Sequence, residues 1–208
     1  MTSTSAQPAR TPGDRAVGDG RGVRGSVGSD AGARGRTVRV VRGLSLLSSG
    51  LLAGAFGYGA VNVVQAFQSV PLEVRLTFHT ALMRMNGPVM QSVMGVAFLS
   101  ALVLAVLWRG TPRMLAAGAS LLTLTTFLVT RFGNVPINRQ IREWLAGSVP
   151  ADHAAILERW ELLNYVRTFT AVAAFVLLLV IVDRATAVAV RPDTGPGARP
   201  DAGRKARR

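Results

Sequence analysis

The stretch NVPINRQIREWLAGSVPADHAAILERWELLNYVR, residues 134–167, is the only long polar insertion between segments of this chain that are apolar enough to cross a bilayer. Because it joins two such segments, it indicates how the helices are connected and where polar chemistry gathers. The residues in it with side chains suited to binding or chemistry are Asn134, Asn138, Arg142, Trp160, Asn164 and Arg167.

The apolar segments on either side predict the third and fourth membrane helices. Residues 114–133 precede the stretch, and the charge-free run TFTAVAAFVLLLVIV, residues 168–182, follows it. Crossing the hydrocarbon takes about 20 helical residues, so the fourth span has to begin earlier, and we predict it over residues 160–182. Its helix then starts within residues 151–160, with Glu158 and Glu161 on faces nearer water.

Polar residues recur at helical spacing on both of these helices. On the fourth, Trp160, Asn164 and Arg167 share one face. On the third, residues 126, 130, 134 and 138 are Thr, Thr, Asn and Asn, which form one polar stripe into the bundle if the helix is continuous. Pro136 predicts a kink or a restart near Asn134, where Asn134 and Asn138 would cap helix ends.

Two further spans lie toward the N-terminus. No charged residue occurs between Arg42 and Glu73, and LSLLSSGLLAGAFGYGAVNVVQAF predicts a span over residues 44–67. The second span is predicted over residues 87–108, with Pro88 in its first turn. Four spans make the chain an all-α, integral membrane, four-helix antiparallel bundle.

A short amphipathic helix is predicted between the first two spans, opening at Pro71. His79 lies on or beside its apolar face. Two interpretations remain open for it: a packed, hydrogen-bonded histidine, or a group that handles protons near neutral pH.

Glycines in the first span indicate close helix packing. Gly50 and Gly54 form a GxxxG pattern, which lets another backbone approach closely. The partner is either another helix of the same bundle or a second copy of the chain, which would make a homo-oligomer through the Gly50/Gly54 face.

Composition narrows the function classes. Hydrophobic residues make up 49% of the 208-residue chain, and cysteine is absent, which excludes disulfides and thiolate chemistry. With two histidines and no HExxH spacing, no metal site is predicted. The formal charge of +13 resides largely in two tails, residues 1–42 and 185–208, which lack aromatic residues. We therefore predict disordered tails and no nucleic-acid partner.

The distribution of basic residues predicts the orientation. The first 42 residues, the residues after Asp183 and the turn at residues 109–113 together hold 17 of the 24 basic residues, and the other two loops hold seven. By the positive-inside rule, both termini of this multi-pass protein are cytoplasmic, in the cell membrane. The stretch at residues 134–167 then lies at the outer face.

Arg167 needs a partner or an exit to water, because an arginine at membrane depth is unfavourable. One interpretation makes it an interfacial anchor, or a partner for Glu143, Glu161 or backbone carbonyls. The other has its guanidinium facing an anionic or phenolate oxygen in a pocket between helices. For Trp160, the ordinary role is a residue of the interfacial aromatic belt.

These motifs resemble the anthrone oxygenase-like family of small four-helix membrane proteins, found in fungi and, mostly as a domain of unknown function, in bacteria. The family pattern is N-x-P-x-N at the end of the third helix and W-x-x-x-N-x-x-R-T entering the fourth. The matching residues are Asn134, Pro136, Asn138, Trp160, Asn164, Arg167 and Thr168. MRMNGPVM, residues 83–90, also resembles the family's Asn-containing start of the second helix, and the resemblance covers about residues 44–182.

The resemblance implies oxidation of a hydrophobic phenolic or polyketide substrate, such as an anthrone, by dioxygen without metal or other cofactor. The residues it implicates in catalysis are Arg167, Asn164, Asn134, Asn138 and His79. Those implicated in substrate binding are Trp160, Tyr165 and Asn86. Bacterial relatives commonly have a histidine at the position of Tyr165, and tyrosine is a poor base at neutral pH, so His79 is the alternative base.

Two other functions remain open from the sequence. In the first, the protein is non-catalytic, with a structural or interaction role, and its polar residues lock the helices together. In the second it is a transporter, although four spans without a visible inverted repeat are few for one.

Overall fold

The computed structural model describes the backbone of residues 21–190 and the side chains of residues 32–184. The described residues divide after Thr37 into two units, and the helical bundle belongs to the unit that begins at Val38. Its regular elements are all helical over the described residues. They are α1 (Arg21–Tyr58), η1 (Gly59–Val63), α2 (Val64–Gln68), α3 (Leu72–Leu107), α4 (Thr111–Val129), η2 (Thr130–Asn134), α5 (Val135–Ala146) and α6 (His153–Val190).

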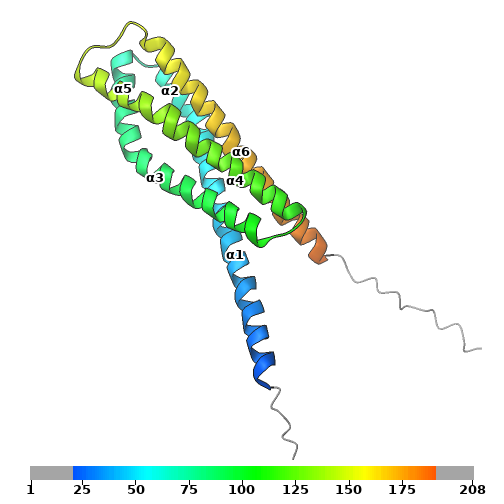
Figure 1. Cartoon of the computed structure of the whole chain (residues 1–208). Helices are drawn as coiled ribbons and strands as arrows, with labels where there is room; N and C mark the ends of the chain where they lie inside the picture. Colours follow the sequence, from blue (N-terminus) through cyan, green and yellow to red (C-terminus); the bar gives the residue numbers. More distant parts are fainter. Residues whose placement is uncertain (1–20, 191–208) are drawn as a thin grey trace, which may run out of the picture. The chain divides into compact units, whose positions relative to one another are not determined.

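Four stretches within the described residues are long and apolar enough to cross a membrane: 32–68, 72–107, 111–146 and 153–184. They run alternately up and down, which makes an antiparallel four-helix bundle, as predicted (Figure 1). The chain is therefore a multi-pass membrane protein. Each stretch is longer than the span predicted for it, because the helices continue beyond their charge-free runs.

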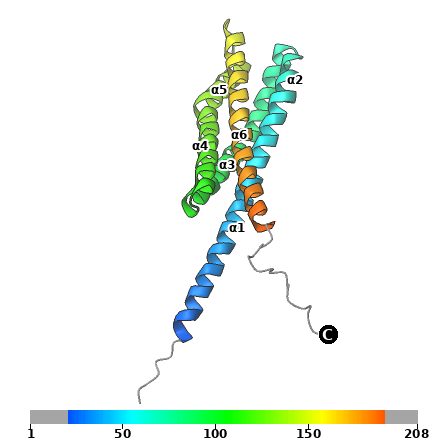
Figure 2. The same ribbon diagram turned by 90° about the vertical axis from the view of Figure 1, so that its right-hand side faces the viewer.

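Helix α6 lies between α1 and α4 (Figure 2). On one side, the hydroxyl oxygens of Thr126 and Thr170 are 2.8 Å apart, across α4 and α6. On the other, Thr168 donates a 3.1 Å hydrogen bond to the backbone oxygen of Phe56 in α1. Helix α3 packs on α4 after a tight turn, where Gly110 has a φ of +67° that other residues adopt with strain. This arrangement leaves α1 and α3 to face each other.

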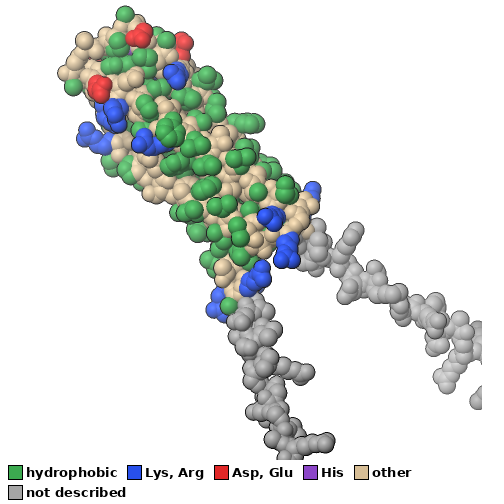
Figure 3. All heavy atoms as spheres, in the orientation of Figure 1, with side chains coloured by type: hydrophobic (Ala, Val, Ile, Leu, Met, Phe, Trp, Pro, Cys, Tyr) green, Lys and Arg blue, Asp and Glu red, His purple; other side chains and the backbone are tan. Residues whose placement is uncertain are grey.

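The surface of the bundle is suited to lipid. Many large hydrophobic side chains are exposed, among them Val61 (69%), Val106 (73%) and Phe169 (73%). Figure 3 shows hydrophobic side chains over the middle of the visible face and charged ones toward its two ends. An apolar surface this large is unusual on a water-soluble protein, and a bilayer covers it naturally.

Helix α3 differs from the prediction. We expected an amphipathic helix over residues 71–86 and a separate span from residue 87, but one helix runs unbroken from Leu72 to Leu107 with Pro88 inside it. The expectation that Pro88 opens a helix was therefore wrong. Pro88 removes one backbone hydrogen bond. Membrane helices tolerate proline where neighbouring groups satisfy the backbone carbonyl that is left free.

The helical backbone continues without a break from α4 through η2 into α5. Pro136 was expected to kink or restart the helix near Asn134, and the structure instead places a wider π turn at residues 130–134, followed directly by α5. Asn134 has helical φ and ψ (−68° and −39°), and its side chain makes no capping bond. The alternative that Asn134 is a helix cap is therefore wrong.

The ends of the described chain also differ from expectation. Composition predicts disorder over residues 1–42 and 185–208, whereas α1 starts at Arg21 and α6 continues to Val190. Residues 1–20 and 191–208 lie outside the described residues, and for them disorder stays a prediction.

Candidate functional site

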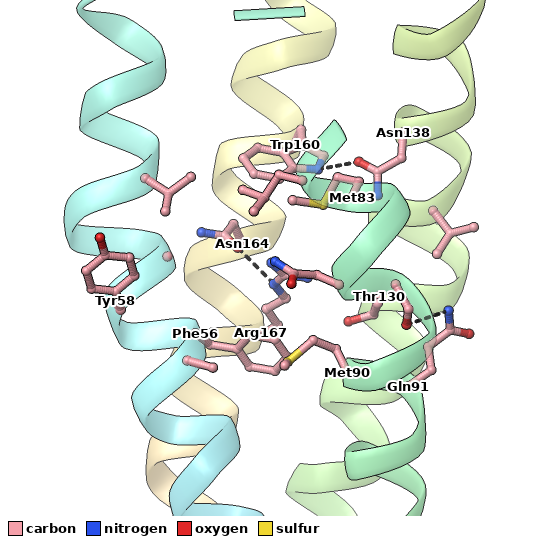
Figure 4. Close-up of a pocket in the computed structure, with 17 residues that line it drawn as sticks. Phe56, Tyr58, Met83, Met90, Gln91, Thr130, Asn138, Trp160, Asn164 and Arg167 are labelled. Carbon is pink, nitrogen blue, oxygen red and sulfur yellow. Dashed lines mark hydrogen bonds between the residues drawn. The ribbon is translucent and has the colours of Figure 1, made fainter. Parts of the chain in front are cut away.

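A cavity of about 170 Å³ lies between α1, α3, α6 and the η2–α5 segment (Figure 4). Two hydrophobic clusters enclose it. On one side is the mid-bundle cluster (Leu52, Phe56, Met94, Ala97 and Ala171). On the other is the loop-end cluster (Val64, Phe67, Leu76, Ile137, Ile141, Trp144, Leu157 and Trp160). The cavity therefore lies between the mid-bundle cluster and the loop-end cluster.

The cavity reaches the surface of the bundle on the α1 side, where Ala55 and Tyr58 are exposed, Tyr58 by 64%. Its polar lining is sparse. The full lining is Ala55, Phe56, Tyr58, Gly59, Val63, Leu82, Met83, Asn86, Gly87, Met90, Gln91, Thr130, Val135, Asn138, Trp160, Asn164 and Arg167. Among these described residues, Arg167 is the one charged side chain.

Arg167 is held by two contacts. Its Nε donates a 2.8 Å hydrogen bond to Asn164 Oδ1, one helical turn earlier on α6. Its guanidinium carbon lies 4.5 Å from the centroid of the Phe56 ring, which is a close cation–π distance. These contacts leave the two terminal amino groups without a protein hydrogen-bond partner among the described residues, and Figure 4 shows them in the middle of the cavity. Glu143 and Glu161, proposed as partners from the sequence, do not pair with Arg167.

Asn138, Trp160 and His79 form a second hydrogen-bonded group. Trp160 Nε1 donates to Asn138 Oδ1 at 2.8 Å, and His79 Nε2 lies 3.0 Å from the same oxygen. The imidazole stacks on Phe67 at 5.2 Å between centroids and meets Trp160 edge-on at 4.5 Å. His79 and Trp160 are each 1% exposed, so Trp160 is a buried anchor, and its assignment to the interfacial belt was wrong.

Two buried asparagines each keep one amide atom unpaired. Asn134 Nδ2 donates to the backbone oxygen of Trp160 at 3.2 Å, while its Oδ1 has no partner among the described residues. Asn164 Oδ1 accepts from Arg167, and its Nδ2 is likewise buried and unpaired. Leaving a buried polar atom unpaired costs about 1–3 kcal/mol, so these positions require an explanation.

The two π turns lie beside the cavity. Gly59 and Val63 of η1 line it from α1, and Thr130 of η2 lines it from the opposite side. Single π turns inside α-helices occur frequently at functional sites. Residues four apart on an α-helix drift by about 40° per step, and the wider turn at residues 130–134 winds part of this drift back. Thr126, Thr130 and Asn134 are consequently all buried, as the predicted stripe requires.

The structure gathers most of the predicted site residues. Arg167, Asn164, Asn138, Trp160 and Asn86 all line the cavity. His79 and Asn134 lie directly behind the lining, in contact with Asn138 and Trp160 respectively. Tyr165 is 44% exposed and does not line the cavity, so the structure does not bring it together with the other predicted site residues.

Sequence reasoning missed a buried charged group above the cavity. Glu161 was expected near water, but it is 9% exposed and accepts from Arg75 Nη2 at 2.8 Å and from Gln68 Nε2 at 2.7 Å. The expectation for Glu161 was wrong because its two partners come from other helices. One signal was present in the sequence: Arg75 precedes His79 by four residues, so the two share a face of α3.

The polar groups of the residues that line the cavity are amides, hydroxyls, the indole N–H of Trp160 and one guanidinium. Within the part of the chain that is described, no three His, Cys, Asp or Glu residues lie close enough together to hold a metal ion.

A sequence model of the anthrone oxygenase family matches residues 74–177, half of the chain. The match takes in the lining residues of α3, η2, α5 and α6, as well as His79. No curated protein and no solved structure matches the chain significantly.

Proposed function

The chain belongs to the anthrone oxygenase family, and from this membership we propose that it oxidises a hydrophobic phenolic substrate with dioxygen in the cavity around Arg167. The observation that carries the proposal is the isolation of that guanidinium. It is the one charge among the described residues that line the cavity, and its terminal amino groups face the space. Such a group stabilises an oxyanion far more strongly here than it would in water.

The size and lining of the cavity fit an aromatic ring. An apolar cavity of about 150 Å³ holds a benzene molecule, and this one has about 170 Å³. Phe56, Met90 and Trp160 supply flat or adaptable apolar contacts. One oxygen-bearing ring of a polycyclic phenol would therefore lie inside, with the remainder directed toward the open side near Tyr58.

The reaction balances with substrate and dioxygen alone. Loss of a proton from the acidic ring CH₂ of an anthrone gives an anion whose negative charge resides largely on the oxygen. That anion reduces dioxygen and forms a C–O bond, and the resulting peroxide takes up the proton. Loss of water then leaves a second carbonyl, so CH₂ and O₂ become C=O and H₂O. Arg167 would lower the barrier by holding the oxyanion as it forms.

Removing Arg167 tests this function. In membranes supplied with anthrone, the wild type consumes oxygen, and Arg167→Ala lowers the rate by about a hundredfold or more, as loss of an oxyanion donor does elsewhere. Arg159→Ala, an exposed arginine on the same helix, is the matched control and leaves the rate unchanged.

The same measurements distinguish an oxygenase from a non-catalytic membrane protein. If the wild type is correctly inserted but consumes no oxygen, anthrone is excluded as its substrate. Equal rates for wild type and Arg167→Ala show that Arg167 has no part in the reaction.

We also infer the cellular placement from the sequence: the cell membrane, with both termini cytoplasmic. Arg39, Arg42, Arg109 and Arg113 lie next to the membrane at one end, and loop arginines of this kind stay in the cytoplasm. The cavity, near the opposite end of the charge-free runs, would then open close to the outer surface.

A further inference from the structure

Chemistry alone fixes the orientation of the Asn138 side chain. The indole nitrogen of Trp160 is a donor only, so the Asn138 atom 2.8 Å away is the oxygen and cannot be the nitrogen. His79 Nε2 lies 3.0 Å from that same oxygen, so this nitrogen carries the hydrogen. The lone pair of the imidazole is then on Nδ1, which is buried and has no partner among the described residues.

With its oxygen occupied twice, Asn138 has only its Nδ2 amino group to offer the cavity. Figure 4 shows this nitrogen directed toward the level of Thr130 and Arg167. Asn164 is fixed by the same logic: the Nε of Arg167 is a donor only, so the oxygen faces it and Nδ2 is left over. That nitrogen is buried away from the cavity, and Figure 4 shows it directed toward α1 and away from Arg167, so the donors that face the cavity are Asn138 Nδ2 and the terminal amino groups of Arg167.

We propose that His79 is a positioning residue which, with Trp160, locks the Asn138 amide so that its Nδ2 joins the terminal amino groups of Arg167 in a donor site for the oxyanion of an ionised phenol or enol. The proposal deepens the function proposed above and rests on it. The ligand class follows from the lining, since Asn138 and Arg167 line the cavity with no carboxylate among its lining residues, and many of those residues are apolar.

The surroundings of His79 exclude direct proton transfer to a ligand in the cavity. The ring is 1% exposed, does not line the cavity, and lies between Phe67 and Trp160. The one nitrogen directed toward the site is its hydrogen-bond donor, committed to Asn138. Without that donor, a single bond from Trp160 would hold the amide, and the carboxamide would be freer to turn its oxygen toward the ligand.

The test uses two substitutions at His79. His79→Gln can place an N–H donor near Asn138, whereas His79→Leu cannot. The probe is a monohydroxyanthraquinone, whose ionised form absorbs at longer wavelength than its neutral form, titrated into the full-length protein in detergent. We expect wild type and His79→Gln to bind the ionised form with similar affinity, and His79→Leu to bind it roughly tenfold or more weakly, the loss expected for a hydrogen bond to a charged group.

A second substitution keeps the proposal falsifiable if His79→Leu does not fold. Asn138→Asp has nearly the same shape and still accepts from Trp160 and His79, but it replaces the free donor by an acceptor. We expect its affinity for the ionised form of the probe to fall by at least tenfold, while its affinity for the neutral form stays the same. Thr77→Leu, on an exposed position of α3, is the control for both.

Two outcomes overturn the proposal. In the first, His79→Gln abolishes oxygen uptake with anthrone and leaves binding of the ionised ligand intact, which identifies His79 as a base. In the second, the wild type fails to select the ionised form, which shows that the donors do not converge on an anion. If anthrone is not oxidised but the binding pattern holds, the proposed reaction fails and the donor site formed by Asn138 and Arg167 stands.

Discussion

At the scale of single residues, the group formed by Gln68, Arg75 and Glu161 joins three helices above the cavity. The Arg75 and Glu161 side chains are only 10% and 12% exposed, and the carboxylate uses both oxygens. Arg75 also lies 5.8 Å from the Phe67 ring, which stacks on His79. The Arg75–Glu161 ion pair therefore stabilises the packing of Phe67 and His79 behind the cavity lining.

Removing one member of this pair leaves the other charge buried without a partner. Glu161→Leu is expected to destabilise the bundle by about 3–5 kcal/mol, and the double variant Arg75→Leu/Glu161→Leu by much less, since replacing both partners of a buried ion pair is often close to neutral. Thermal unfolding in detergent, followed by tryptophan fluorescence, measures whether the double variant is more stable than Glu161→Leu. A double variant less stable than Glu161→Leu would contradict it.

At the scale of elements, η2 determines how α4 and α5 approach α6. A β-carbon built at Gly133 would lie 2.8 Å from a terminal carbon of Leu163 on α6. The π turn and Gly133 therefore have complementary effects. The π turn rotates the polar stripe toward the inside of the bundle. Gly133 lets the backbone of η2 approach α6 closely enough for Asn134 to donate to the carbonyl of Trp160.

Enlarging this glycine is expected to push the two helices apart. Gly133→Val lowers the free energy of unfolding by about 1–3 kcal/mol, the usual cost of overpacking. Gly95→Val is the matched control, because nothing lies within 4 Å of a β-carbon at Gly95 in α3. Thermal midpoints of the two variants measure the difference, and equal shifts would show that the close approach at Gly133 is unimportant.

The sequence predicts elements of this kind unevenly. Long charge-free runs fix the number of helices because hydrocarbon tolerates few other structures. The preference of proline for the first turn of a helix predicted a helix start at Pro88, and the structure has none there. Tertiary packing and membrane burial override the preference of a single proline. Spacing placed Trp160, Asn164 and Arg167 together correctly. It could not show that Glu161 is buried, because the ion pair joins residues 86 positions apart.

At the scale of the whole molecule, the orientation in the membrane determines which compartment the cavity faces. The connection at residues 147–152 and the turn at residues 108–110 lie at opposite ends of the bundle (Figure 1). The chain has no cysteine, so any single cysteine introduced at one end reports on that end without background.

Labelling with a membrane-impermeant maleimide tests the inferred orientation. Ser148→Cys, exposed between α5 and α6, is expected to react in intact cells. Thr111→Cys, exposed at the start of α4, should react only after permeabilisation. The reverse pattern would place both termini outside.

The open flank of the cavity beside Ala55 and Tyr58 has a kinetic consequence. It lies within the first membrane-spanning stretch, so a ligand there would exchange with lipid more readily than with water. The concentration governing occupancy would be the ligand's mole fraction in the bilayer, set by partitioning and diluted by every added vesicle. A Michaelis constant quoted per litre of solution would then describe the amount of lipid in the assay as much as the protein.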